Sequence, residues 1–446
     1  MAKKLNFVYN YIGPKGPLSN QFVPNLMDLT PHVSNDNKFT HVNAFFYKFF
    51  DPKQVNISTP WFREVRSPQT PRDRWMDLPQ DSFLYELGPS WPDGHFKSIF
   101  NKEYGGVWDS YPHSKEIKDR LRQGTAYLVL SVDDESYCDR ETIDLMHDYF
   151  DSKGIPRTSV IYVTNSPTAR QVIESWYPDG NHLQMEHITK LRHANYRTPY
   201  PEAVTEYQPG ARQKLFLCFN RNFHKHRIWF YLAMYKRKLL DKFYFSMPMK
   251  HPISKGTFLD HAQKHIDDDM RNDLSLITAL DFDVVKDIEH CGGTLPQELD
   301  KGFYSKGLDV INSNQGVIQF YDNSLIHVIT ETHCYSEFIH VTEKTWKVIN
   351  FLQPFIVLAT KGHLAYLRSL GFKTFHEFWD ESYDLIEDHG LRLLAVVDLV
   401  SNISNWSAQR QLEFSHAVKD IVDYNFAHYQ TLGPIEPTAF IERYGV

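Results

Sequence analysis

The sequence lacks the features that mark several large classes of protein. None of its apolar runs reaches the roughly 18 residues that a membrane-spanning helix needs, and no apolar leader segment precedes the first strand-like run. Its four cysteines are scattered and form no CxxC pair, which argues against a disulfide framework and a zinc ribbon. We therefore expect a soluble, cytoplasmic protein without a membrane partner.

The sequence also lacks a strong charge of either sign and several common catalytic motifs. With 48 basic and 55 acidic residues, its net charge is -7, which argues against a chain that coats nucleic acid over its whole surface. The strings GxSxG, HExxH and GxxxxGK[ST] are absent, so the hydrolase and ATPase templates built on them do not apply. A local basic groove remains compatible with this composition.

The sequence contains apolar and charged residues in the proportions of an ordinary globular protein. Apolar residues make up 42% of the 446 residues and charged residues 23%, which indicates folded domains rather than disorder. This length is typical of two or three domains. Aromatic residues reach 15%, and such rings serve in packed cores and in stacking on sugars or bases.

Short continuous apolar runs alternate with helical patterns along much of the chain. Such runs are typical of strands buried on both faces of a parallel sheet. The sequence predicts strands at 5–12, 125–132, 159–164, 214–219, 317–321, 325–330 and 354–358. We therefore expect an α/β protein with two Rossmann-like domains facing a cleft and a helical C-terminal tail.

The domain boundaries follow from composition. A Pro-rich, polar segment at 197–210 separates the two strand–helix patterns and indicates a linker. We expect an N-terminal Rossmann-like domain at 1–210, with an irregular aromatic-rich insertion, and a C-terminal Rossmann-like domain at 211–382. The residues 383–446 are expected to form the helical tail.

The first candidate site is the polar turn after the strand at 214–219. Asn220, Arg221 and Arg227 surround a helix start, where free N–H groups and the helix dipole favour an anion such as phosphate. Ten basic residues and one acidic residue fall between positions 212 and 250, so the mildly acidic total hides a basic stretch. For Lys236 and its basic neighbours, a solvated helix face remains the alternative.

The second candidate site follows the strand at 325–330. Thr342 is placed to cap a helix that begins with Glu343 and Lys344, and Glu331 lies upstream. A carboxylate that accepts ribose hydroxyls beside a cation that reaches a diphosphate suits a nucleotide sugar. The alternative is a capped helix whose first-turn charges are simply solvated.

The order of these motifs resembles the donor domain of the α-1,3-fucosyltransferase family. The strand KLFLCF, the polar turn, Arg227, the string YDNS at 321–324, TEK at 342–344 and the strand QPFIVL follow one another over roughly 213–360. The resemblance implies that Arg227, Glu331, Glu343 and Lys344 contact the donor. The family has Glu before its Asn-Ser, where this chain has Asp322, and Glu331 is expected to take the acidic role.

The C-terminal part also resembles uncharacterised glycosyltransferase-like proteins of large tailed phages. The matching strings are TEKT and QPFI, then LRSLGFKTF at 367–375 and WDESYD at 379–384. The two resemblances imply a hexosyl- or pentosyltransferase of the GT-B type with a UDP- or GDP-sugar donor, and a phage origin implies the host cytoplasm. They also imply that 1–210 is the acceptor domain and 211–382 the nucleotide-sugar donor domain. The resemblance to phage proteins also raises double-stranded DNA with hydroxymethylated bases as the acceptor, and a glycan is the other option.

A catalytic base is expected in the N-terminal domain, because a transferase needs a group to take the acceptor proton. Asp133, Asp134 and Glu135 directly follow a buried strand, although capping of the next helix is an equal alternative. Lys15, near the first Gly/Pro loop, is a further candidate for the donor phosphates.

Metal sites are not expected. Asp281 and Asp283 match a D-x-D pattern but lie in an acidic helical stretch, where a solvated face explains them better. The His-Cys pairs at 290–291 and 333–334 lack partners at metal-binding spacing, which favours structural burial. We expect no obligatory metal.

A rival hypothesis is a non-catalytic protein that binds nucleic acid or glycans and keeps a vestigial nucleotide-sugar fold. The basic stretch and the abundant aromatics would serve such a protein. Binding alone does not account for Glu343 beside Lys344 at a helix start, so a transferase remains the preferred hypothesis.

Overall fold

The computed structural model describes about two-thirds of the chain in enough detail for analysis. The described residues are 5–10, 55–58, 61–64, 72–75, 83–87, 100, 114–131, 139–187, 206–220, 222–248, 256–272, 275–281, 315–431 and 442–444. The chain divides into two compact units. Unit 1 comprises 1–191 and 434–446, and unit 2 comprises 192–433.

Unit 1 contains a six-stranded sheet in which all described pairs are parallel. The strand order is β2-β1-β5-β6-β7-β8. The strands are β1 (Leu5–Asn10), β2 (Val55–Ser58), β5 (Phe83–Leu87), β6 (Ala126–Ser131), β7 (Val160–Thr164) and β8 (Gln184–His187). A separate antiparallel pair is formed by β3 (Trp61–Glu64) and β4 (Arg72–Trp75).

The described helices of unit 1 alternate with its later strands. They are α3 (Ser114–Arg122), α4 (Arg140–Ser152) and α5 (Ala169–Trp176), with a short 3-10 segment at Arg157–Ser159. Asp139 caps α4 by accepting a hydrogen bond from the Thr142 N–H at 2.7 Å, and Gly154 closes the following turn at φ 63°. Helix α4 therefore begins and ends at residues suited to those positions.

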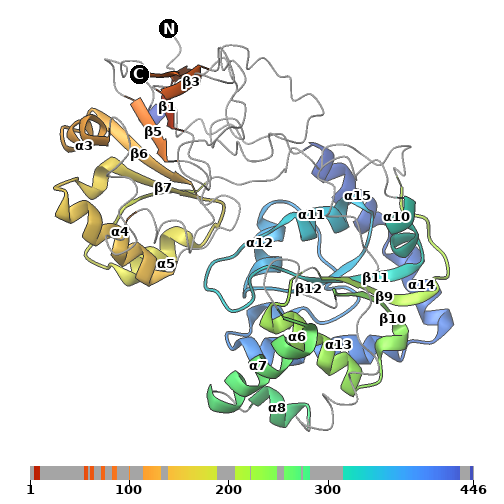
Figure 1. The fold of residues 1–446 in the computed structure, drawn as a ribbon. Helices are drawn as coiled ribbons and strands as arrows, with labels where there is room; N and C mark the ends of the chain where they lie inside the picture. The colour runs from red at the N-terminus through yellow and green to blue at the C-terminus, as the bar shows by residue number, and fades with distance from the viewer. Residues whose placement is uncertain are drawn as a thin grey trace. The chain divides into compact units, whose positions relative to one another are not determined.

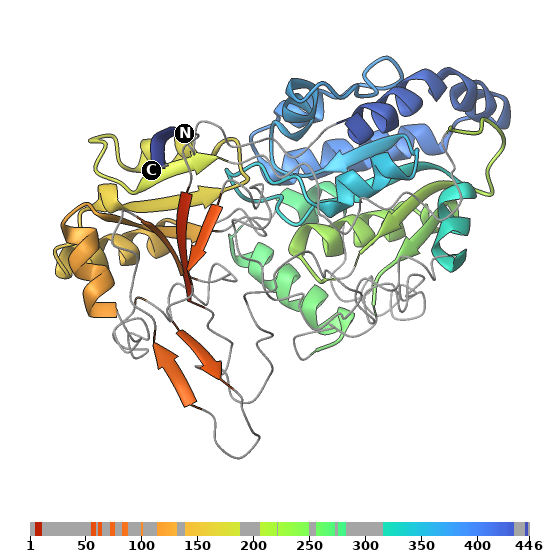
Figure 2. The same cartoon turned by 90° about the horizontal axis from the view of Figure 1, so that it is seen from above.

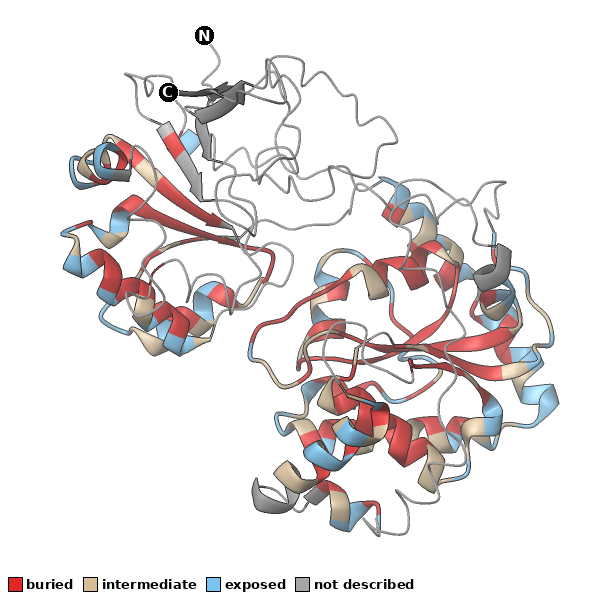
Figure 3. Cartoon of the chain, in the orientation of Figure 1, coloured by how far each residue is buried: buried red, intermediate tan, exposed pale blue. Residues whose placement is uncertain are grey.

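Unit 2 contains a second parallel sheet, with the strand order β10-β9-β11-β12. Its strands are β9 (Lys214–Phe219), β10 (Phe243–Ser246), β11 (Ser324–Thr330) and β12 (Phe355–Leu358). Every residue of β11 and β12 is buried, as expected for strands covered on both faces (Figure 3). The prediction of two parallel-sheet α/β units is thus confirmed.

Helices cover both faces of the sheet in unit 2 (Figure 1). One layer holds α6, α7 and α13, and the opposite layer holds α10, α11 and α15; Figure 2 shows unit 2 from above. The helices of unit 2 are α6 (Lys225–Lys236), α7 (Phe258–Asn272), α8 (Ser275–Ala279), α10 (Gln315–Asp322), α11 (Glu343–Asn350), α12 (His363–Ser369), α13 (His389–Ser404), α14 (Ala408–Ala417) and α15 (Lys419–Thr431). Short 3-10 segments lie at Leu240–Lys242 and Ser382–Leu385.

The C-terminal helices are part of unit 2. Helix α13 packs against α6 and β12, and α15 packs against α11. The buried Arg392 of α13 donates hydrogen bonds to the carbonyls of Cys334 (2.6 Å) and Ala359 (2.9 Å). The helical character predicted for the C-terminal tail is confirmed by α13, α14 and α15, which pack within unit 2.

The chain end belongs to unit 1. Tyr444 packs its ring against Tyr127 with centroids 5.1 Å apart, and its hydroxyl donates to Gln184 at 2.6 Å. Arg443 forms an ion pair with Glu186 of β8. Arg443 and Tyr444 therefore contact β8, the edge strand of the sheet in unit 1.

One predicted strand is wrong. The residues 317–321 lie in helix α10, not in a strand. Their β-branched and aromatic side chains favour a strand, but the packing of a helix against the sheet can outweigh this strand propensity. Here Tyr321 is buried against Leu217 of β9, and α10 leads directly into β11.

Among the helices that the structure describes, none is both long and apolar enough to cross a membrane.

The burial of His327 in β11 predicts a specific sensitivity to acid. Burial, and then the charge of Lys347, lower the pKa of His327 to about 3, so the folded chain keeps this ring neutral below the pKa of about 6.5 that it has when unfolded. Its contribution to stability is therefore present at neutral pH and is lost as the pH falls from 6.5 towards 3.

We expect His327→Phe, which keeps a ring between Phe219 and Tyr321, to weaken the acid dependence of the unfolding free energy. Between neutral pH and pH 5, the wild type should lose roughly 2 kcal/mol more than the variant. Denaturant titrations at both pH values measure this difference. The same substitution at the exposed His416 is the control, and equal losses in all three proteins would contradict the prediction.

Candidate functional site

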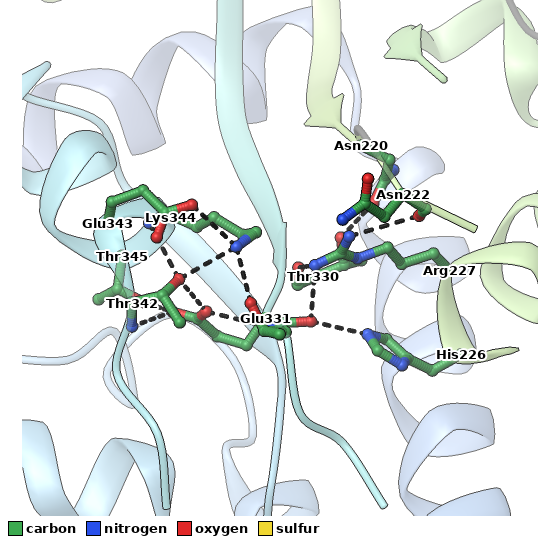
Figure 4. A network of polar contacts seen from close by, with 11 residues as sticks. Asn220, Asn222, His226, Arg227, Thr330, Glu331, Thr342, Glu343, Lys344 and Thr345 are labelled. Atoms are coloured by element: carbon green, nitrogen blue, oxygen red, sulfur yellow. Dashed lines mark hydrogen bonds and ion pairs between the residues drawn. The ribbon is translucent and has the colours of Figure 1, made fainter. Parts of the chain in front are cut away.

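The two polar clusters meet where strands β9 and β11 lie side by side. From β9 the chain passes through α6 to β10, which lies on the side of β9 away from β11. From β11 it passes through α11 to β12, which lies on the side of β11 away from β9. The carboxyl ends of two neighbouring strands whose connections diverge in this way form the usual ligand position of an open α/β sheet. Thr330 of β11 donates to Asn220, just after β9, at 2.5 Å, which ties the two strand ends together (Figure 4).

Glu331 is the buried centre of the second cluster. Its side chain is 0% exposed, and one carboxylate oxygen accepts hydrogen bonds from the Thr342 N–H at 3.1 Å and the Thr345 hydroxyl at 2.6 Å. The other oxygen accepts from the Thr342 hydroxyl and from the Thr332 N–H (Figure 4). A carboxylate at a helix start is favoured by the dipole, and here it fixes the start of α11.

Arg227 is also buried, at 1% exposed. Its guanidinium donates to the carbonyls of Thr330 (3.1 Å), Glu331 (3.0 Å) and Asn222 (3.4 Å). His226 makes a further contact of 2.8 Å between its Nε2 and the Glu331 carbonyl. The first turn of α6 is therefore hydrogen-bonded to the end of β11, and the positive charge of Arg227 lies against the carbonyls at that end.

Lys344 and Glu343 are the accessible members of the cluster. Their side chains are 20% and 30% exposed and form an ion pair of 3.0 Å. The Lys344 ammonium also donates to the hydroxyls of Thr332 (2.9 Å) and Thr342 (3.2 Å). Thr342 caps α11 by accepting from the Lys344 N–H at 3.2 Å, so the predicted cap is confirmed.

Histidines add to the polar character of this region. His224 stands at the N-cap of α6 without a side-chain capping bond, and its ring stacks on that of His226. Burial first, and then the charge of Arg227, hold the pKa of both imidazoles well below the ordinary value. Both rings are therefore neutral at neutral pH.

Sequence reasoning did not single out His224 or Thr345. Thr345 could have been found from the spacing, since a second threonine three residues after Thr342 returns to the same side of a helix start. For His224 the signal was its position directly before a helix, which brings a side chain to the end of the strand.

Several predicted residues lie outside the described part of the chain. These are Lys15, Asp133, Asp134, Glu135, Arg221, Asp283, His290 and Cys291. Asp281 is described, exposed and in a turn after α8 with a φ of 49°. Of the basic stretch, Arg237 pairs with Asp398 of α13 at 2.5 Å, which joins two helices instead of presenting a free cation.

Thiol and metal chemistry find little support in the described residues. Burial raises the pKa of Cys218 to about 12 and that of Cys334 to about 11, so neither thiol supplies a thiolate at neutral pH. In the described ranges, no three side chains of His, Cys, Asp or Glu gather in a way that would hold a metal ion.

Comparisons with known proteins return likeness of structure only. No family model matches the sequence, and no curated protein matches it. A UDP-forming α,α-trehalose-phosphate synthase from Burkholderia vietnamiensis is 9% identical, with a TM-score of 0.38 over 82% of this chain and 74% of its own. A glycosyltransferase from Rickettsia africae is 11% identical, with a TM-score of 0.33 over 81% of this chain and 89% of its own. At this level, the likeness carries no argument about activity.

The bonding of Glu331 predicts a large difference between two chemically identical substitutions. Glu331→Gln places an NH₂ group against hydroxyl and N–H donors, so we expect it to lower the unfolding free energy by roughly 1–3 kcal/mol. Glu343→Gln changes an accessible carboxylate and should alter it by less than about 0.5 kcal/mol. Denaturant unfolding measures both values. Equal effects of the two variants would show that the Glu331 carboxylate does not hold the start of α11.

Proposed function

We propose that the protein is a glycosyltransferase that moves a hexose or pentose from a nucleotide-sugar donor to an acceptor hydroxyl. The observation that carries this proposal is the position of the cluster at the diverging connections of β9 and β11. Two helices begin there: α6, with the buried Arg227 in its first turn, and α11, with the partly exposed Lys344 in its first turn. Helix starts and cations together favour a diphosphate.

The residues divide into two roles in this proposal. Lys344 contacts the diphosphate and Glu343 accepts hydrogen bonds from ribose hydroxyls, because both side chains are accessible. Arg227 and Glu331 act as positioning residues, since their polar groups are bonded to the protein and buried. Asn220 and Thr342 hold the strand end and the helix start in place, and Arg221 is a further candidate donor contact.

The finer parts of the proposal rest on the sequence. Asp133, Asp134 or Glu135 supplies the base that takes the acceptor proton, and no obligatory metal takes part. The resemblance to phage proteins supports double-stranded DNA with modified bases as the acceptor, and a glycan is the other acceptor that we propose to test. The donor is proposed to be a UDP- or GDP-sugar, and the proposed compartment is the host cytoplasm.

A donor-hydrolysis screen tests the reaction class directly. The purified chain is incubated with UDP-, GDP-, CDP- and dTDP-sugars, and release of the nucleoside diphosphate is followed. The same compounds at millimolar concentration should raise the melting temperature if a donor site exists. Binding without release, with or without a DNA or glycan acceptor, would favour the non-catalytic binding protein instead.

Lys344→Ala should lower turnover at least 100-fold, because it removes the accessible cation proposed to meet the diphosphate. The melting temperature without ligand should change little, since the side chain is partly exposed. Release of the nucleoside diphosphate measures the effect. Lys361→Ala, which removes a surface lysine paired with Glu387, is the matched control. Wild-type turnover by Lys344→Ala would refute this assignment.

A further inference from the structure

The ammonium of Lys344 has as many hydrogen-bond partners as it has N–H groups. It donates to the hydroxyls of Thr332 at 2.9 Å and Thr342 at 3.2 Å, and to a carboxylate oxygen of Glu343 at 3.0 Å. A lysine ammonium carries three N–H groups, so these bonds use all of them. A phosphate oxygen that binds Lys344 must therefore replace one of the three partners.

The two hydroxyl partners of Lys344 belong to residues that Glu331 holds in place. The Thr342 hydroxyl donates to the Glu331 carboxylate and, as the cap of α11, accepts from the Lys344 N–H. The backbone N–H of Thr332 donates to the same carboxylate. Because Glu331 is fully buried, moving either threonine would cost hydrogen bonds to a buried charge. Both hydroxyls therefore stay with Lys344 when a ligand arrives.

Glu343 is the partner of Lys344 that a ligand displaces most easily. Its side chain is 30% exposed, against 20% for Lys344. Water solvates the separated charges of an accessible ion pair, so such a pair contributes little to stability. A phosphate oxygen carries the same negative charge as the carboxylate and can take its place on the ammonium.

The displaced carboxylate then lies close to the bound phosphate, because Glu343 and Lys344 are adjacent in the first turn of α11. The two negative charges repel each other. Hydroxyl groups on the ligand offset this repulsion by donating hydrogen bonds to the carboxylate, which accepts but cannot donate. Pyrophosphate has no such hydroxyls, whereas the ribose of a nucleoside diphosphate has two. One ribonucleotide can thus replace both members of the ion pair in a single binding event.

We propose that Glu343 is a specificity-determining residue that competes with phosphate for Lys344 and is displaced only by a diphosphate joined to a ribose with both hydroxyls. The inference rests on the proposed function and deepens it, because it restricts the donor to sugars of ribonucleoside diphosphates. Free pyrophosphate and deoxyribonucleotides such as dTDP are disfavoured. Selectivity of this kind combines an attractive contact with a repulsive one.

Isothermal titration calorimetry with matched ligands tests the proposal. UDP, 2′-deoxyuridine diphosphate, GDP, 2′-deoxyguanosine diphosphate and inorganic pyrophosphate are titrated into the full chain. Each ribonucleotide and its deoxy counterpart carry the same charge, so the ratio of their affinities isolates the hydroxyl. Glu343→Ala is the test variant, because it removes both the charge and the acceptor. Glu387→Ala, which removes the carboxylate of the exposed pair with Lys361, is the matched control.

We expect the wild type and Glu387→Ala to bind each ribonucleotide about tenfold more tightly than its deoxy counterpart, since a hydrogen bond to a charged group is lost. In Glu343→Ala this ratio should fall close to one. The affinity for pyrophosphate should rise about three- to fivefold, because the competing carboxylate is gone.

The melting temperature without ligand shows whether Glu343→Ala is folded. Glu343→Gln, which keeps a neutral acceptor, is a second variant, and its ratio should lie between those of the wild type and Glu343→Ala.

A wild-type ratio near one, or a ratio that both Glu343 variants leave unchanged, would overturn the inference. So would an equal gain in affinity for all five ligands, which the loss of a negative charge alone explains. The proposed function would remain in place in these cases, provided that Lys344→Ala abolishes nucleotide binding. If none of the five ligands binds the wild type, and no nucleotide sugar is hydrolysed, the proposed function and this inference both fail.

Discussion

The site of unit 2 depends on one buried carboxylate. Glu331 stands at the end of β11, and its side chain holds Thr342 and Thr345 at the start of α11. Its backbone carbonyl receives hydrogen bonds from Arg227 and His226 at the start of α6. A single residue thus connects two helices that leave neighbouring strands in opposite directions. The relative position of these helix starts, and of every group they carry, follows from that connection.

Pairing or hydrogen bonding offsets the cost of burying a charge, and both buried charges at the centre of this site are hydrogen-bonded to the protein. The Glu331 carboxylate accepts hydrogen bonds from hydroxyl and N–H groups, and the Arg227 guanidinium donates hydrogen bonds to backbone carbonyls. Lys344 and Glu343 are partly exposed and paired with each other, so they are the members of this cluster that a ligand can reach.

Much of this arrangement could be predicted from the sequence, because it follows from local patterns. The apolar runs that became β6, β7, β9, β11 and β12 were long enough, and bounded clearly enough, to indicate parallel strands. Parallel strands bring their carboxyl ends to one edge, so the polar residues that follow β9 and β11 lie at the same edge of the sheet. Thr342 as a helix cap followed from its residue type and position.

Other features could not be read from local patterns, because they depend on which neighbours a segment meets. The residues 317–321 carry a strand-like composition, yet a helix buries Tyr321 against β9. The roles of Glu331 and Arg227 depended on burial, and a motif does not reveal whether a charged group faces solvent or the backbone. Once burial is known, the accessible partner of each buried charge becomes the group that can meet a ligand. That reasoning directs attention to Lys344 and Glu343, because these two partly exposed side chains stand at the start of a helix whose buried end is already fixed by Glu331.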